Sequence, residues 1–259
     1  MTESLPHMPI SRRAALKQAT AVAAGMTVVG LTGSPASAAT PPSAPTSPTP
    51  PAPIDISEAL RRHRAEQERV HTGKPSLNGW EMEKVADDAG SVWTCPVPGT
   101  PLRGAQLRLG DVESVLVHVI RRFHYEVDEL RAGDVIGWRH PSEVRGGLAE
   151  SNQASGTAVQ IRPGFYPSGA RGGFFPNQLT VVRDILVDCA GVVRWGGDDT
   201  VPDESLFYID TKPGDERLVR VAAGLRRRTA VPGRGAGSGP DPFRPERREA
   251  AKRLARRQS

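Results

Sequence analysis

The segment 151–160 reads S-N-Q-A-S-G-T-A-V-Q and places two glutamines, Gln153 and Gln160, seven residues apart. A neutral amide is a poor zinc ligand, because zinc favours imidazole, thiolate and carboxylate groups. Further along, W-G-G-D at 195–198 is followed by Asp203, a carboxylate that could transfer a proton as a general acid or base. The chain has no G-x-S-x-G segment and no sign of a histidine-activated cysteine, so it offers no evident serine or cysteine nucleophile.

The first segment resembles a zinc-binding motif of the D-Ala-D-Ala carboxypeptidase and L-Ala-D-Glu peptidase family. The family motif reads S-x-H-x-x-G-x-A-x-D, and its His and Asp hold the metal. Ser151, Gly156 and Ala158 match this motif, and the seven-residue spacing is kept. Gln153 and Gln160 stand at the two ligand positions. The resemblance therefore implies a peptidase framework without two of its zinc ligands.

The second segment resembles the same family, in which W-G-G-D precedes an acidic residue and, three positions later, a His in a strand of the form M-H-F-E-I. Trp195 and Asp198 match the start of this motif. Asp203 falls on the acid/base position, and Leu206 falls on the position of the third zinc ligand. Tyr208 replaces the family's glutamate. By this alignment all three metal ligands, at Gln153, Gln160 and Leu206, are absent.

The resemblance covers residues 76–225 and implies the Hedgehog/DD-peptidase fold. That fold is α+β, a single domain with a small antiparallel sheet flanked by helices. We expect a non-catalytic homologue that has lost its zinc, has no cofactor and binds cell-wall peptide in the remnant groove. Family members place an arginine that grips the substrate carboxylate near Arg139 and Arg145, although two solvated arginines are an open alternative. The expected binding residues are Arg139, Arg145, Ser151, Trp195 and Asp198.

Two other functions remain open at this point. The first is an active wall peptidase with replacement ligands drawn from Asp198, Asp199, Asp203, Glu204 and His140. Such oxygen-rich ligands favour calcium or magnesium over zinc, and the ion would be structural rather than catalytic. The second is an interaction module whose basic C-terminal tail binds anionic wall polymers or phospholipid headgroups.

Residues 1–38 have the features of a twin-arginine signal peptide. S-R-R-A-A-L-K at 11–17 precedes a weakly apolar run over 19–31, which is too short and too mild for a stable transmembrane helix. Small residues at 36–38 predict cleavage after Ala38, with an uncleaved membrane anchor as the alternative. We expect twin-arginine export, an extracellular or wall-associated location, and no transmembrane domain after cleavage. Residues 39–56 are predicted to be a Pro-rich linker.

The basic character of the chain is concentrated at its C-terminus. The whole chain has a net charge of +5, whereas residues 226–259 contain eleven basic and three acidic residues. The intervening body is therefore acidic, which argues against a nucleic-acid-binding domain. We predict a disordered, solvated tail over 226–259, within which residues 246–258 could form a short cationic helix.

Cys95 and Cys189 are the two cysteines of the chain. An even number of cysteines in an exported domain permits one disulfide, and we predict a bond between these two. Neither cysteine has the spacing of a redox or zinc-finger motif.

Residues 57–225 are predicted to form the domain, with helices and strands interspersed. The apolar stripe from Val112 to Leu130 predicts the strongest helix, which we expect to run to Arg131 with Asp111 as its N-cap. Other helices are predicted over 57–71, 177–189 and 215–225. Strands are predicted over 92–97, 135–138, 157–161, 192–195 and 206–209.

Overall fold

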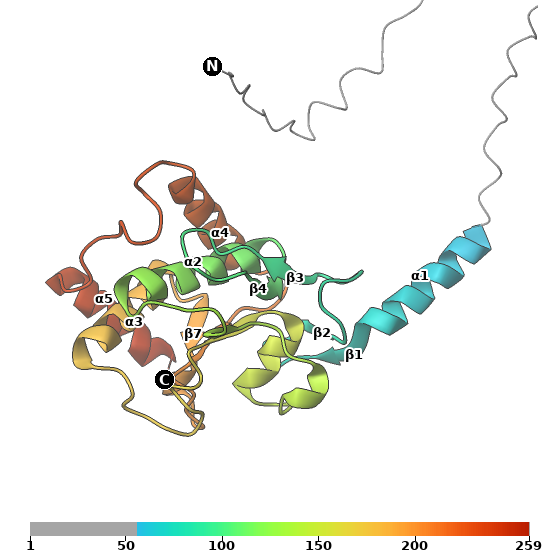
Figure 1. Ribbon diagram of the computed structural model, residues 1–259, viewed down its shortest axis with the longest axis horizontal. Coiled ribbons are helices and arrows are strands. Elements are labelled where there is room, and N and C mark those ends of the chain that lie inside the picture. Colours follow the sequence, from blue (N-terminus) through green and yellow to red (C-terminus); the bar gives the residue numbers. More distant parts are fainter. Residues whose placement is uncertain (1–55, 259) are drawn as a thin grey trace, which may run out of the picture. The chain divides into compact units, whose positions relative to one another are not determined.

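The structure of the protein is a computed structural model that describes residues 56–258 (Figure 1). The predicted signal peptide and the predicted linker, apart from Ile56, lie outside the described residues. The helices and strands are, in order, α1 Ile56–Val70, β1 His71–Pro75, β2 Glu81–Glu83, β3 Val92–Cys95, β4 Ala105–Arg108, α2 Asp111–Glu126, β5 Val135–Ile136, η1 Pro141–Glu143, η2 Ala149–Ser155, β6 Ala158–Ile161, α3 Pro176–Asp188, β7 Val193–Trp195, η3 Gly196–Asp198, β8 Leu206–Ile209, α4 Glu216–Thr229 and α5 Pro245–Gln258.

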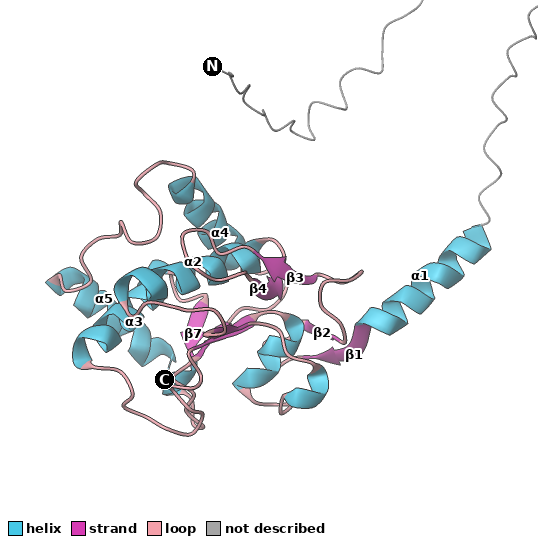
Figure 2. Ribbon diagram, in the orientation of Figure 1, coloured by secondary structure: helices cyan, strands magenta, loops and turns pink. Residues whose placement is uncertain are grey.

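The protein has an α+β fold, as predicted, with small antiparallel sheets (Figure 2). The largest sheet has the strand order β5-β6-β8-β7, and β1-β2 and β3-β4 form two separate antiparallel pairs. The strand predictions for 206–209 and, within a residue, for 157–161 and 192–195 are confirmed. No helix within residues 56–258 is both long and apolar enough to cross a bilayer.

The four-stranded sheet has one apolar face and one polar face. Because side chains alternate along a strand, Val159, Phe207 and Trp195 point together into the main core, where α2 and α3 cover them. The opposite face presents Gln160, Leu206, Ala158, Tyr208 and Arg194. The 3₁₀ helix η2 lies against this second face, with Ala149 packed on a small apolar cluster. The polar face is therefore where a ligand can approach the sheet.

Helix α2 is shorter than its apolar stripe predicts. It begins at Asp111 after Gly110, which has φ 95°, and the Glu113 carboxylate accepts a hydrogen bond from the Gly110 N–H at 3.2 Å. Gly110 is thus the N-cap, and Asp111 is the first helical residue rather than the predicted cap. The helix ends at Glu126, because the chain turns back and the Leu130 N–H donates to His124 Nδ1 at 2.9 Å. Leu130 still reaches the core from this loop.

A buried polar network joins the turn 76–80 to the segment that contains the first motif. The Leu77 N–H donates to Ser151 Oγ at 3.0 Å, and the Asn78 N–H donates to Asn152 Oδ1 at 3.0 Å. Asn78 Nδ2 also donates to the Ile209 carbonyl at 2.8 Å. Gly156 follows η2 as its C-cap, with φ 68°, and a Cβ there would lie 2.7 Å from the backbone nitrogen of Arg108. The motif residues Ser151 and Gly156 therefore fix the position of η2.

The C-terminal region differs from the predicted disordered tail. Helix α4 continues to Thr229, and α5 forms within a residue of the predicted cationic helix but packs against α3 with Leu254 buried. Arg247 Nε donates to Asp184 Oδ1 at 2.5 Å, and Gln258 Nε2 donates to the Val193 carbonyl at 3.0 Å. The prediction missed this packing because the helix is rich in arginine, and its acidic partner lies more than sixty residues earlier in the chain.

Asp184 and Asp188 of α3 are the centre of an ion-pair network that links four helices. The guanidinium of Arg122 on α2 contacts Asp184 at 3.0 Å and Asp188 at 3.8 Å. Arg228 of α4 donates to both oxygens of Asp188 at 2.9 and 3.0 Å, and His118 lies 2.7 Å from the same carboxylate. Burying a charge is costly unless it is paired, so these contacts hold α4 and α5 on the domain.

The two cysteines are free, so the predicted disulfide is not formed. Cys95 lies at the end of β3 and Cys189 follows α3, and both side chains are buried. Burial raises the pKa of Cys95 to about 11 and that of Cys189 to about 12. Both therefore favour the neutral thiol and behave as small apolar side chains in the core.

The ion pair between α5 and α3 predicts that Arg247→Ala destabilises the protein. Asp184 is fully buried and would lose one charged hydrogen bond, which contributes about 1.5–3 kcal/mol. The free energy of unfolding should fall by this amount in urea denaturation. Lys252→Ala is the matched control, because Lys252 lies on the same helix but pairs only with exposed Glu249. Coincident unfolding curves for Arg247→Ala and the unmodified protein would show that the ion pair with Asp184 does not stabilise the fold.

Candidate functional site

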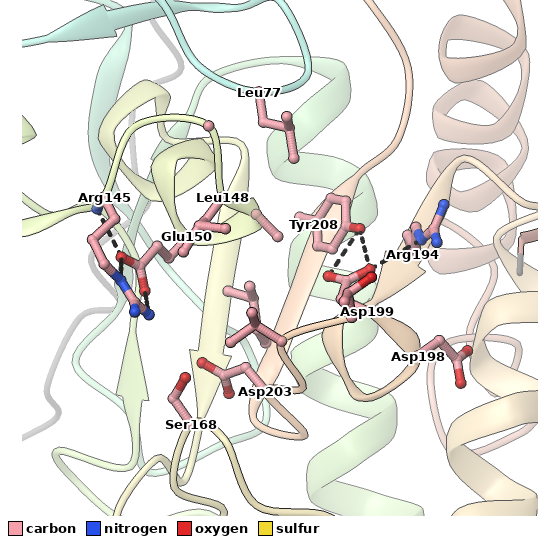
Figure 3. A pocket seen from close by; sticks show the side chains of 15 residues that line it. Leu77, Arg145, Leu148, Glu150, Ser168, Arg194, Asp198, Asp199, Asp203 and Tyr208 are labelled. Atoms are coloured by element: carbon pink, nitrogen blue, oxygen red, sulfur yellow. Dashed lines mark hydrogen bonds and ion pairs between the residues drawn. The ribbon is translucent and has the colours of Figure 1, made fainter.

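A cavity of about 290 Å³ opens on the polar face of the sheet. Its walls come from η2 and the loop before it, from η3 and the loop after it, and from β7 and β8 (Figure 3). Leu77 from the turn 76–80 and Leu148, Leu206 and Val201 give it apolar surface. Six charged side chains also line it: Arg145, Glu150, Arg194, Asp198, Asp199 and Asp203.

Asp199, Tyr208 and Arg194 form a cluster, joined by hydrogen bonds and an ion pair, on one wall of the cavity (Figure 3). The Tyr208 hydroxyl donates to Asp199 at 3.0 and 3.1 Å, and Arg194 Nε lies 3.3 Å from Asp199 Oδ1. Burial raises the pKa of Asp199, and the tyrosine and arginine offset only part of this effect. Burial also raises the pKa of Tyr208, so the phenol remains a hydrogen-bond donor.

Asp203 is held by the residues that surround it. Its Oδ2 accepts a hydrogen bond from Gln160 Nε2 at 2.8 Å, and its Oδ1 accepts bonds from the Ser205 N–H at 3.0 Å and hydroxyl at 2.5 Å. The side chain is nearly buried but lines the cavity. Asp203 therefore has a defined orientation beside Gln160 and Leu206.

The structure places two of the three positions that the motif alignment assigns to zinc ligands side by side. Gln160 on β6 is paired directly with Leu206 on β8, so their side chains lie on the same face. Gln160 is also paired with Ile136 on β5, and Gln153 Nε2 lies 3.3 Å from the Ile136 carbonyl and 2.9 Å from that of Gly137. Gln153 thus lies beside the strand that pairs with Gln160, and Leu206, but neither glutamine, lines the cavity.

These side chains do not fit a zinc ion. Leu206 has no donor atom, and the amide nitrogens of Gln153 and Gln160 already donate to a carbonyl and to Asp203. The two amide oxygens are buried without a hydrogen-bond partner among the described residues, but neutral amide oxygen is a poor ligand for zinc. Over residues 56–258, no three His, Cys, Asp or Glu side chains converge to hold a metal.

The alternative ligands for calcium or magnesium are engaged elsewhere. Asp198 forms a two-pronged ion pair with Arg183 of α3, one contact of which is 2.6 Å. The Glu204 carboxylate accepts hydrogen bonds from the N–H groups of Gly172 and Gly173, both at 2.7 Å. His140 bonds to Ser142 at 2.7 Å beside η1. Of these alternative ligands, only Asp199 and Asp203 line the cavity without a two-pronged ion pair to an arginine. Two carboxylates do not supply enough oxygen ligands to bind calcium or magnesium.

Among the predicted binding residues, Arg145 and Asp198 line the cavity, whereas Trp195 and Ser151 are structural. Trp195 is buried in the core, and its Nε1 donates to the Glu204 carbonyl at 2.8 Å. A Cβ at Gly197 would lie 2.3 Å from the Trp195 ring, which explains the need for glycine in W-G-G-D. Arg139 is half-buried before η1 and does not line the cavity.

Arg145 is already paired at the mouth of the cavity (Figure 3). Its Nε and Nη2 donate to the two oxygens of Glu150 at 2.7 and 2.9 Å, and its own N–H donates to the same carboxylate. The Glu150 pair raises the pKa of Arg145, and the Arg145 hydrogen bond lowers the pKa of Glu150. The guanidinium group of Arg145, which was expected to bind a substrate carboxylate, is thus already bound to the carboxylate of Glu150.

The charged lining has a net charge of −2, because four carboxylates outnumber two arginines, and this becomes −1 when Arg183, the partner of Asp198, is included. Opposite charges attract strongly where water is partly excluded. The cavity therefore favours a ligand with a positively charged ammonium group near Asp199 and Asp203.

The sequence did not predict the Tyr208–Asp199–Arg194 cluster. One signal was present: Tyr208 lies two residues after Leu206 and must therefore share its face of the strand. The partners could not be deduced, because Arg194 reaches this face through the pairing of β7 with β8 and Asp199 through a loop.

Comparisons with known proteins do not assign the chain to a family. No family model matches it, and the searches of curated proteins and of solved structures found no significant match.

Asp199→Asn and Asp188→Asn should change the pH dependence of stability in opposite directions. The folded state raises the pKa of Asp199 above 3.8, so ionisation opposes folding as the pH rises above that value. Burial would raise the pKa of Asp188 too, but His118 and Arg228 outweigh it and hold this pKa low. The Asp188 carboxylate thus stabilises the fold above pH 3.8 and loses this effect as the pH falls through its folded pKa.

The measurement is urea denaturation of each variant beside the unmodified protein at about pH 3 and about pH 7. Relative to that protein, Asp199→Asn should be more stable at the higher pH than at the lower one. Asp188→Asn should lose more stability relative to the unmodified protein at the higher pH than at the lower one. The same pH trend in both variants would contradict the arrangement of charges described above.

Proposed function

We propose that this protein is an exported, non-catalytic homologue of the zinc D-Ala-D-Ala and L-Ala-D-Glu peptidases, with a Hedgehog/DD-peptidase-like fold. The single observation that carries the proposal is the direct pairing of Gln160 with Leu206, beside Asp203. This is where the motif alignment requires two zinc ligands and the acid/base carboxylate to meet. The donor set there cannot hold zinc, so Asp203 has no metal-activated water to deprotonate.

The proposed role of the cavity is to bind a cell-wall peptide. The apolar surface from Leu77, Leu148 and Leu206 suits a short aliphatic side chain, and the hydrogen-bonding groups of Asp199 and Tyr208 suit a polar one. Because the lining is acidic and Arg145 is paired with Glu150, we assign the main recognition to a ligand ammonium group rather than to a carboxylate. This revises the carboxylate-gripping role expected for Arg145.

A synthetic peptide ending in Lys-D-Ala-D-Ala tests the role of the cavity. It should bind the unmodified protein more tightly with a free lysine amine than with an acetylated one, as measured by calorimetric titration. Asp199→Asn should weaken binding of the free-amine peptide by about tenfold, because a partly buried charge–charge contact contributes about 1.4 kcal/mol or more.

Asp210→Asn is the matched control. Asp210 carries the same charge, and burial also raises its pKa, but it does not line the cavity. Equal binding of the free and acetylated peptides, or equal losses in the two variants, would contradict the proposed recognition. The peptide should also remain uncleaved, as checked by mass spectrometry.

The zinc-peptidase ancestry predicts that the metal site can be rebuilt. The triple variant Gln153→His, Gln160→Asp and Leu206→His should bind about one zinc per chain, because it supplies two imidazoles and a carboxylate at the three positions that the motif alignment assigns to the ligands. The double variant that retains Leu206 should bind zinc much more weakly. Metal analysis of purified protein is the measurement. Stoichiometric zinc in the unmodified protein would contradict the proposed loss of the metal, and zinc bound by the triple variant would support the motif alignment.

A further inference from the structure

We propose that a second cavity, formed by α4 and the loop that follows it, binds a phosphate-bearing anion. This cavity has a volume of about 570 Å³ and is distinct from the acidic cavity on the sheet. Its charged lining consists of Arg220, Arg227, Arg228, Arg234 and Asp188. Four guanidinium groups face one carboxylate, so the net charge of the lining is +3.

The single carboxylate does not neutralise the cavity, because its charge is already shared. Asp188 accepts two hydrogen bonds from Arg228 and a further contact from His118. Arg122 lies 3.8 Å away as well. This arrangement fixes Arg228 as part of the cavity wall, and the Asp188 charge does not compensate the other arginines.

The remaining arginines are available to a ligand. The side chains of Arg227 and Arg234 are exposed and make no ion pair with any residue in the described part of the chain. Arg220 pairs with Glu216 at 3.1 Å, but both side chains are more than half exposed. An exposed pair of this kind contributes little to stability, so an incoming anion can compete for Arg220.

The local structure explains why these residues converge. Positions 220, 224 and 227 lie on one face of α4, and Gly224 in the middle has no side chain to fill the space. After Thr229 the chain turns twice, through hydrogen bonds from the Val231 N–H to the Arg228 carbonyl and from the Arg234 N–H to the Val231 carbonyl, both at 3.1 Å. These turns bring Arg234 back beside the helix.

Helix polarity opposes an anion here but does not outweigh the arginines. The C-terminus of a helix carries about half a negative charge, which is small beside a net charge of +3. Planar guanidinium groups bind phosphate oxygens through paired hydrogen bonds, and several of them around one cavity match an anion with several charged oxygens. A free polyphosphate and a phospholipid headgroup share this chemistry, so the experiment must distinguish them.

The test is calorimetric titration of the full chain with inorganic tripolyphosphate. The double variant Arg227→Ala, Arg234→Ala should bind at least about tenfold more weakly, because each arginine contributes charged hydrogen bonds. Arg256→Ala, Arg257→Ala removes the same charge from exposed positions of α5 outside the cavity and should leave the affinity unchanged within about twofold. Absent binding, or equal losses in both double variants, overturns the proposal.

Gly224 provides a second pair of variants that keeps every arginine. A Cβ at Gly224 meets no atom within 4 Å, so both Gly224→Ala and Gly224→Glu are compatible with the fold. Gly224→Glu should abolish tripolyphosphate binding by placing a carboxylate among the arginines, whereas Gly224→Ala should retain it. Equal affinities for the two variants overturn the assignment to this cavity.

Vesicles distinguish the two sources of phosphate. If the natural ligand is a lipid headgroup, phosphatidylglycerol vesicles should sediment the protein, phosphatidylcholine vesicles should not, and Gly224→Glu should prevent sedimentation. If it is a soluble phosphate compound, tripolyphosphate should bind while neither vesicle does. Sedimentation that Gly224→Glu leaves unchanged, together with no binding of tripolyphosphate, overturns the cavity site in favour of a general surface attraction.

Discussion

The pairing of β6 with β8 is the constraint on which the polar face of this protein depends. It sets Gln160 opposite Leu206, and the alternation of side chains then sends Phe207 into the core and Tyr208 toward the cavity. A shift of one residue in this register would exchange the two faces and place Phe207 in the cavity. The register is therefore held by the apolar core on one side and by the hydrogen bond from Gln160 to Asp203 on the other.

The distribution of charge gives the domain two cavities of opposite character. Carboxylates from η3 and the loop after it make the sheet cavity acidic, and arginines from α4 make the second cavity basic. Asp184 and Asp188 of α3 pair with Arg122, Arg228 and Arg247, and through Asp188 and Arg228 this network also forms part of the wall of the basic cavity. The C-terminal region is thus part of the fold, so deleting it would remove core packing along with positive charge.

The sequence predicted those elements whose pattern is local and long. The stripe from Val112 to Phe123 gave α2, and the alternation over 206–209 gave β8. It did not predict β1, β2 or β4, which are short and owe their pairing to partners in another segment. The disulfide and the disordered tail were predicted from composition. Composition does not determine how far apart two sulfur atoms lie, nor which buried carboxylate pairs with an arginine of the tail.

The sequence by itself determined the side-chain types at the positions that matter: amides at 153 and 160, an aliphatic side chain at 206, and carboxylates at 198, 199 and 203. Residue type alone decides whether a side chain has an atom that binds zinc well, so the absence of suitable ligands at these positions could be stated before any fold was known. Only the tertiary structure decided that Arg145 is occupied by Glu150 and that Tyr208 and Arg194 meet at Asp199. These contacts depend on strand register and loop closure, which join residues through space rather than along the chain.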